Sequence, residues 1–360
     1  MDKELAVVPT FELTINGKNV TQDVSAWVST VEFKDRLEEA SSEVQIVFND
    51  IAGLWQGTWY PQQSDSLNLK LGYKGRKLLD CGDFEIDEIE LKGQPDEMTV
   101  KAIAAAISKD LRTRKSRAFE KQTLHQIAKK IADDNGLKMM GDTSKLSNIK
   151  VGRKTQDNQS DLAFLAETSK KFGIIFSVRG KDLVFLNPED LEKTPSIAEY
   201  KRQQLSSYSF KDKTADTYES ASVSQRDIKT NRVNNWMDTL NNKEIYKSDT
   251  IIVGGRVEND SQAQAVSKGA IREQNKDKLT GSFSTDGNPL LVSGANVDLK
   301  EFGQFSGKWT IKESTHKIDV SSGYRTEVSI RKGPYAKKYE VVKSGHSEGK
   351  QNWAKTLYNQ

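Results

Sequence analysis

The chain has 360 residues, a formal net charge of +3 and 35% hydrophobic residues, with 8% aromatic residues spread along it. This length predicts two or three domains, and recurring apolar periodicity argues against intrinsic disorder. No stretch approaches the ~18 apolar residues of a membrane-spanning helix, and the acidic N-terminus lacks the apolar run of a signal peptide. The single cysteine, Cys81, excludes an internal disulfide and a cysteine-based zinc site, so a cytoplasmic origin is the default expectation.

The net charge lies in a C-terminal tail. Residues 334–360 contain five lysines and two glutamates, a net charge of +3, so residues 1–333 sum to zero. A neutral body argues against a sequence-specific nucleic-acid-binding protein. The tail is either a frayed terminus or a segment that orders on a partner. Because apolar anchors dominate interfaces, we expect Trp353, Leu357 and Tyr358 to be its docking residues.

Residues 10–103 have β patterning. Apolar and polar residues alternate with period 2, which predicts strands with one buried face, as in an antiparallel barrel or sandwich. The alternation slips between Ile86 and Ile89, which predicts a bulge near Asp87 and Glu88. A loop at 52–63 carries Trp55, Trp59 and Tyr60. The alternating segments are Phe11–Ile15, Val44–Phe48 and Leu67–Leu71.

The middle of the chain changes to helical periodicity. Leu124, Ile127, Ala128 and Ile131 follow i, i+3, i+4, i+7 spacing, which predicts an amphipathic helix that Gly136 ends. A second helix begins after Ser160 or Asp161 and ends at Gly173. Residues 174–186 then form a hairpin that turns at Gly180. This pattern predicts a small α+β domain, and a charged, proline-containing boundary follows at 187–196.

From Leu205 onward β patterning returns, with a third helix at 259–275 and strands that carry Trp309, Ile311, Tyr324, Val328 and Ile330. The polar stretch 233–256 has no clear assignment. The two flanking β regions could be copies of one barrel. We therefore expect a β-rich α+β protein in which two antiparallel β-barrel domains flank a small α+β domain. The expected domains are 1–107, 108–200 and 201–333, followed by the tail 334–360.

No catalytic, cofactor or metal site is recognisable. His125 lies on the polar side of its helix, His316 at the end of a strand, and His346 in the tail, so no metal-binding pair forms. Glu85 and Asp87 could suggest a glycosidase pair, but a solvated strand face explains them more simply. Gly254 and Gly255 are interpreted as a turn, because the dinucleotide-binding GxGxxG motif and a parallel β-α-β context are lacking. The sequence also contains no GxxxxGK[ST] motif. The sequence favours a structural or interaction role.

Several segments together resemble the phage late control D family. They are residues 123–137, 159–186, the helix 261–275, residues 278–299, and 307–330, which contain His316 and Gly323–Tyr324 in the family's usual order. The polar stretch 233–256 and the tail are where the sequence departs from the family's pattern.

The resemblance implies a baseplate hub of a contractile phage tail or phage-derived bacteriocin, similar to the N-terminal part of type VI secretion spike proteins. It implies a homotrimer with two tube-like barrels per chain, joining the hexameric tail tube protein to the trimeric tail spike protein. Other baseplate proteins and the tape measure protein are further implied partners. The particle would be assembled in the bacterial host cytoplasm, without a cofactor or membrane insertion.

Two other functions remain open at this stage. One is a tail-associated peptidoglycan hydrolase, which would need an acid/base pair or a Cys/His arrangement. The other is a glycan-binding tail-tip module, suggested by Trp55, Trp59 and Tyr60.

Overall fold

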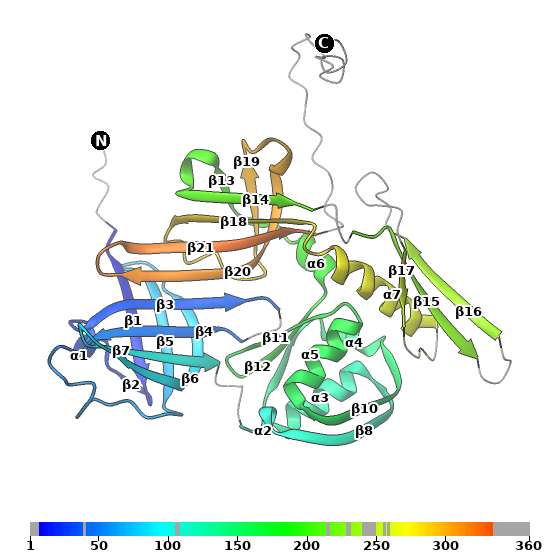
Figure 1. Ribbon diagram of the computed structural model, residues 1–360, viewed down its shortest axis with the longest axis horizontal. Coiled ribbons are helices and arrows are strands. Elements are labelled where there is room, and N and C mark those ends of the chain that lie inside the picture. The colour runs from blue at the N-terminus through cyan, green and yellow to red at the C-terminus, as the bar shows by residue number, and fades with distance from the viewer. Residues whose placement is uncertain are drawn as a thin grey trace, which may run out of the picture.

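The computed structural model describes residues 7–38, 41–104, 109–213, 217–227, 232–239, 250–254, 257 and 260–333 (Figure 1). The expected docking residues Trp353, Leu357 and Tyr358 lie outside these ranges, and so does Gly255 of the predicted turn.

The first β region contains the predicted strands. Its alternating apolar residues, such as Val44, Ile46 and Phe48, point into one core, which confirms the period-2 reading. The ladder register shifts between Ile86 and Glu88, which confirms the bulge predicted there. Its elements are β1 (Pro9–Ile15), β2 (Lys18–Asn19), α1 (Thr21–Val24), β3 (Val28–Arg36), β4 (Glu43–Asn49), β5 (Ser66–Tyr73), β6 (Leu79–Lys92) and β7 (Glu97–Ala104).

The middle of the chain forms an α+β insert, defined here as residues 109–195. Its predicted helices are α3 (Leu124–Asp134), which Thr123 caps with a capping box, and α5 (Asp161–Lys171), which Ser160 caps. Gly136 and Gly173 follow these helices with φ of 66° and 67°, the left-handed conformation that favours glycine.

The insert repeats a strand–helix–strand unit that the sequence analysis missed. The first unit is β8 (Arg114–Thr123), α3 and β9 (Lys138–Gly141); the second is β10 (Lys150–Ser160), α5 and β11 (Ile175–Arg179). β8 pairs with β10, whereas β9 and β11 flank β12 (Asp182–Leu186), the second strand of the predicted hairpin. Few residues of β8 and β10 are apolar, so their alternation is weak. The short helices α2 (Lys109–Arg112), α4 (Thr143–Ser147) and α6 (Pro188–Lys193) complete the insert.

The second β region confirms the predicted third helix as α7 (Asp260–Asn275). The polar stretch near 233–256 contributes β16 (Arg232–Thr239) and β17 (Thr250–Val253), which flank β15 (Ser220–Asp227) in a small sheet beside α7 (Figure 1). The other strands are β13 (Ser196–Lys201), β14 (Ser207–Asp212), β18 (Leu279–Asp286), β19 (Asn296–Lys300), β20 (Gly307–Asp319) and β21 (Gly323–Lys332).

Strands from both β regions, namely β1–β7, β13, β14 and β18–β21, form one 13-stranded sheet, which corrects the expectation of two separate barrels. The sheet is antiparallel except where β13 pairs with β19, and its described strands do not close into a barrel. The physical reason is β20, which changes partner at a register shift between Ile311 and Glu313. Residues 307–310 pair with β19 and residues 313–319 pair with β3, so one long strand belongs to both regions.

The two β regions nevertheless share one strand order. The first runs β3-β4-β7-β6-β5 and the second runs β14-β18-β21-β20-β19, in both cases through antiparallel neighbours. Register shifts occur at matching places, around Asp87 in β6 and Lys312 in β20. The order differs at the next strand, because β1 is antiparallel to β5 whereas β13 is parallel to β19. The topology therefore supports the idea that the regions are copies of one unit.

Candidate functional site

The contact between the two β regions is a strand pair, called here the joint: residues 313–319 of β20 against residues 30–36 of β3. Glu313 accepts a hydrogen bond from Arg36 (3.1 Å) and lies 3.5 Å from Lys34. At the other end, Thr30 donates to Asp319 (3.0 Å). Cross-strand pairs of opposite charge favour one register of such a ladder.

His316 lies inside the joint and is fully buried, not at a strand end as the sequence analysis expected. Its Nε2 lies 3.0 Å from the carbonyl oxygen of Leu291, which can only accept, so Nε2 carries the proton. Nδ1 then accepts from the hydroxyl of Tyr324 at 2.8 Å. Burial lowers the pKa of His316 to about 4, because the charged ring would lose its hydration. The imidazole is therefore a neutral bridge rather than a proton donor for catalysis.

Asp35, within the joint, connects three parts of the chain. Its carboxylate accepts from Ser42 Oγ (3.0 Å) and from the backbone N–H of Ser293 (2.8 Å). Arg179 of the insert donates to the Ser293 carbonyl (3.0 Å) and lies 3.8 Å from Asp35. The insert is thus tied to both β regions at one point.

A second set of buried ion pairs ties α7 to the sheet. Glu38 accepts from Arg331 (2.6 Å) and Lys276 (3.0 Å). Burial alone would raise the pKa of Glu38, but the two cations outweigh it and lower that pKa to about 2. Arg272 of α7 reaches Glu192 of α6 at 2.7 Å. Because Glu38 follows β3, these contacts join the first β region to the second, and α7 to the insert.

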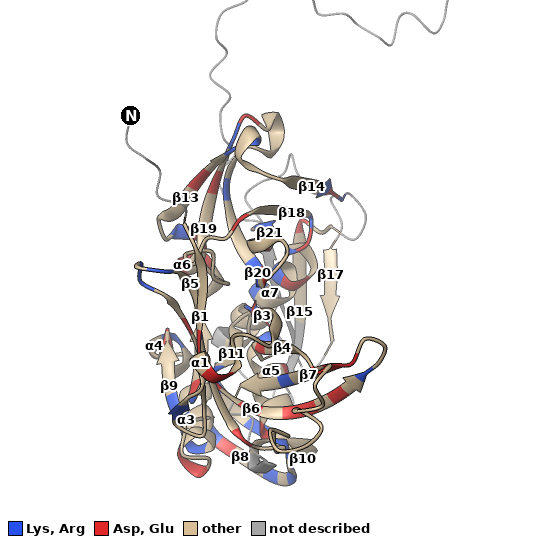
Figure 2. Cartoon of the chain, turned by 90° about the vertical axis from the view of Figure 1, so that its left-hand side faces the viewer, with Lys and Arg blue, Asp and Glu red and all other residues tan. Residues whose placement is uncertain are grey.

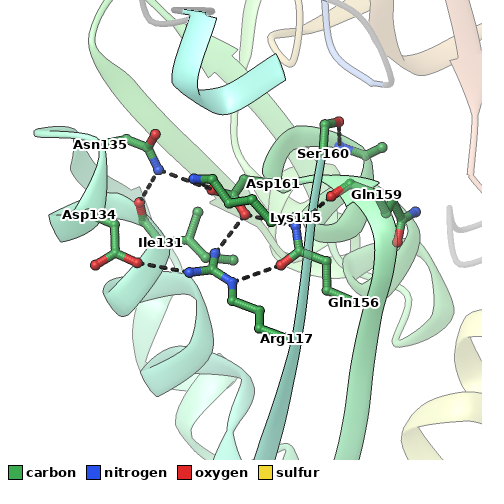
Figure 3. Close-up of polar contacts among 10 residues, drawn as sticks. Lys115, Arg117, Ile131, Asp134, Asn135, Gln156, Gln159, Ser160 and Asp161 are labelled. Atoms are coloured by element: carbon green, nitrogen blue, oxygen red, sulfur yellow. Dashed lines mark hydrogen bonds and ion pairs between the residues drawn. The ribbon is translucent and has the colours of Figure 1, made fainter. Parts of the chain in front are cut away.

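Inside the insert, Asp161 is a fully buried carboxylate at the start of α5 (Figure 3). It accepts from Lys115 (2.6 Å), Arg117 (2.6 Å) and Gln156 (2.8 Å), so β8 and β10 are both joined to α5. Burial raises the pKa of Asp161, but these hydrogen bonds and the Arg117 charge lower it overall. The network supplements the few apolar contacts that these strands make through Phe119 and Val151.

The carboxylates considered for catalysis do not form an acid/base pair. Asp87 lies 3.7 Å from Arg112, Glu88 contacts Lys101 at 2.9 Å, and both side chains are more than half exposed. Asp83 is exposed, and Glu85 is half-buried on the same strand. Within the described ranges, no three His, Cys, Asp or Glu side chains gather as metal ligands.

The aromatic residues of loop 52–63 divide into two groups. Trp55 is buried and stacks on Phe48 with ring centroids 3.7 Å apart, so it belongs to the core. Trp59 packs edge-on against Trp55 at 5.6 Å and is 39% exposed, and Tyr60 is 47% exposed. Only these two remain accessible to a partner.

Sequence reasoning missed the residues of the joint. His316 and Tyr324 were noticed as a motif, but Asp35 and Arg36 of the joint, and Glu38 beyond its end, carried no recognisable signal. A buried ion pair looks like any surface charge in a sequence, since its partner is distant in the chain.

In the comparison with protein families, residues 85–322 match the model of the phage tail baseplate hub (GPD) family. The chain belongs to this baseplate hub family. A curated relative, the probable baseplate hub protein of Escherichia phage 186, is 30% identical over 186 residues, which are 52% of this chain and 47% of the relative. The chain thus spans about half the length of the hub relative it matches.

Two solved structures share the hub fold. The 43 kDa tail protein of prophage MuSo2 from Shewanella oneidensis has a TM-score of 0.66 at 14% identity, over 89% of this chain and 98% of that one. An E. coli component of the type VI secretion system has a TM-score of 0.53 at 13% identity, over 94% of this chain and 77% of that one. These two likenesses concern the fold alone. Among the described helices of this hub-family chain, none is long and apolar enough to cross a membrane.

Proposed function

We propose that the chain is a structural, non-enzymatic baseplate hub of a contractile phage tail or a phage-derived injection machine. In this role a homotrimer joins the hexameric tail tube to the trimeric spike. The observation that carries the proposal is the repeated strand order within one continuous sheet. Three chains with two similar β units each present six similar units, which is what an adaptor between threefold and sixfold neighbours requires.

Within this proposal, each β region acts as one tube-like unit that completes its barrel-like shape on assembly. Three cores partly support this division: one in the first β region, one around Trp309 in the second, and one in the insert that also takes in Val223, Ala263 and Val266 of the second region. The division at residues 107 and 200 remains a proposal. β13 crosses the second boundary and pairs with β19.

The molar mass of the assembled protein tests the proposal. The full chain, purified alone and mixed with its tail tube and spike proteins, is measured by light scattering over a concentration series. A trimer, and a complex of three hub chains with one spike trimer, is expected. A chain that stays monomeric in every mixture contradicts the hub role.

The tail at 334–360 is proposed as a docking element for the spike or another baseplate protein. The support is its composition: five lysines together with Trp353, Leu357 and Tyr358. β21 ends at Lys332, and Pro334, two residues later, cannot donate to a sheet ladder, so the strand is not expected to continue into the tail.

A further inference from the structure

The joint occurs once in the chain, but the repeated topology contains a second set of edges that could form it. In the joint, β3 is covered by the second half of β20. In the repeated strand order, β14 of the second region occupies the position of β3. The second half of β6 in the first region occupies the position of the second half of β20. Among the described strands, β14 pairs only with β18, and residues 88–92 of β6 pair only with β7.

β3, which is paired on both sides, and β14, which is paired on one side, also differ in burial. β3 has no exposed residue, whereas five of the six residues of β14 are exposed. In β6, Leu91 is 49% exposed, whereas its counterpart in β20, His316, is fully buried. An open strand edge with an exposed leucine readily takes up another strand.

The repeated ladders give the residue-by-residue correspondence. The register shifts align Glu88 of β6 with Glu313 of β20, so Leu91 aligns with His316. Paired residues on neighbouring strands extend this correspondence across the sheet. In the first region Phe33, Val44, Ala102 and Ile86 are successive cross-strand partners. Their counterparts in the second region are, in the same order, Phe210, Gly281, Ile330 and Ile311.

We propose that β14 of one copy of this chain pairs antiparallel with residues 88–92 of β6 of a second copy, repeating the joint between copies. The inference rests on the proposed hub function and names its subunit contact. Because the two edges are different surfaces, the contact is heterologous, and three such contacts close a ring. Main-chain hydrogen bonds of an added strand supply affinity, and facing side chains supply register.

The side chains that this register brings together are complementary. Glu313 faces Arg36 in the joint, and the same positions between copies hold Glu88 and Lys213. In the joint Thr315 also faces Lys34. At the corresponding positions of the proposed contact, Glu90 of one copy would face Lys211 of the other. Neither Lys211 nor Lys213 has an ion-pair partner in the part of the chain that the structure describes.

The apolar residues that this register brings together also match those of the joint. His316 faces Phe33 in the joint, with ring centroids 6.1 Å apart. The matching pair between copies is Leu91 and Phe210. Figure 2 shows β6, with its acidic segments, and β14 in different parts of the molecule, so the two strands can meet only between copies.

The first test is a disulfide trap in a Cys81→Ser background. One chain carries Leu91→Cys and a differently tagged chain carries Phe210→Cys, because directly opposed residues of an antiparallel pair lie within disulfide reach. Mild oxidation should link the two chains. Ser207→Cys in place of Phe210→Cys is three residues out of register and should not link. Equal linking by both pairs, or none by either, overturns the inference.

The second test exchanges charges in the full chain. Lys211→Glu with Lys213→Glu, and separately Glu88→Lys with Glu90→Lys, should each weaken self-association about tenfold or more in sedimentation velocity. The fourfold variant should recover it. Lys121→Glu with Lys150→Glu, on exposed positions of the insert, is the matched control and should associate normally. Circular dichroism and melting curves check that each variant folds.

The outcomes separate the two proposals. If trimers form but neither the trap nor the charge exchange affects them, the strand contact is wrong and the hub function stands. If the chain remains monomeric even with its tube and spike proteins, the hub function fails together with the contact.

Discussion

The hydroxyl of Tyr324 donates a hydrogen bond to Nδ1 of His316 over 2.8 Å, inside the strand pair that joins the two β regions. Tyr324 also packs in the core of the first β region, although β21 belongs to the second. The hydrogen bond itself lies within the second region, between β20 and β21, and it holds the Tyr324 ring that packs into the core of the first. The order His316…Gly323–Tyr324 in the sequence marks a hairpin, since Asp319 faces Gly323 across its turn.

We expect acid to loosen the joint. The pKa of His316 is about 4 in the folded chain and near its ordinary 6.5 when unfolded. Between these values the unfolded chain binds a proton that the folded chain does not, so stability falls as the pH drops from 6.5 to 4. Over this whole pH range the free energy of unfolding should fall by roughly 3 kcal/mol. Urea unfolding of the wild type and of His316→Gln across this range measures the effect.

The glutamine variant removes the titrating group but keeps a donor and an acceptor, so its stability should depend less on pH in this window. His125→Gln, in the insert, is the matched control for the substitution itself. Identical pH profiles for the wild type and His316→Gln would refute the assignment.

Asp161→Asn should loosen the insert. The change removes a buried negative charge and leaves Lys115 and Arg117 without their common partner, which costs about 3 kcal/mol. Native-state hydrogen exchange of α3 and α5 measures the local effect. Asp157→Asn, on an exposed position of β10, should leave the exchange rates unchanged. Equal protection in both variants would mean that the network does not hold the insert.

Cys81→Ser should leave assembly intact and cost about 1 kcal/mol of stability. Burial raises the pKa of the Cys81 thiol well above its ordinary value, and nearby Asp80 raises it further. Little thiolate is therefore present at pH 8, and an aromatic disulfide reagent should react slowly until the chain is unfolded. Fast reaction of the folded chain, or loss of assembly in the folded serine variant, would contradict a purely structural role.

Deleting residues 335–360 should leave the melting temperature nearly unchanged, because β21 and its ladder end at Lys332. Binding to the spike or a neighbouring baseplate protein should weaken. The loss should be larger at low salt, where the lysines contribute most. The triple variant with Trp353, Leu357 and Tyr358 changed to Ala separates the apolar anchors from the charge. Complete, functional tails from the truncated chain at normal yield would make this segment an ordinary frayed end.

The sequence by itself determined the local elements. Period-2 alternation located β1, β4 and β5, helical spacing located α3, α5 and α7, and the phase slip at Asp87 located a bulge, because each of these depends on neighbours in the chain. The order of several weak segments indicated the family. The sequence did not predict β8 and β10, because these strands carry few apolar residues and are held largely by a buried polar network.

Only the tertiary structure decided how the two β regions meet. Pairing of residues 313–319 with residues 30–36 joins strands separated by nearly the whole chain, and no local pattern encodes such a partner. The same holds for Glu38 with Arg331 and for Asp35 with Ser293, whose charge and polarity read as surface features until folding brings them together. Separate barrels were expected because alternation shows which face of a strand is buried but does not name the strand beside it.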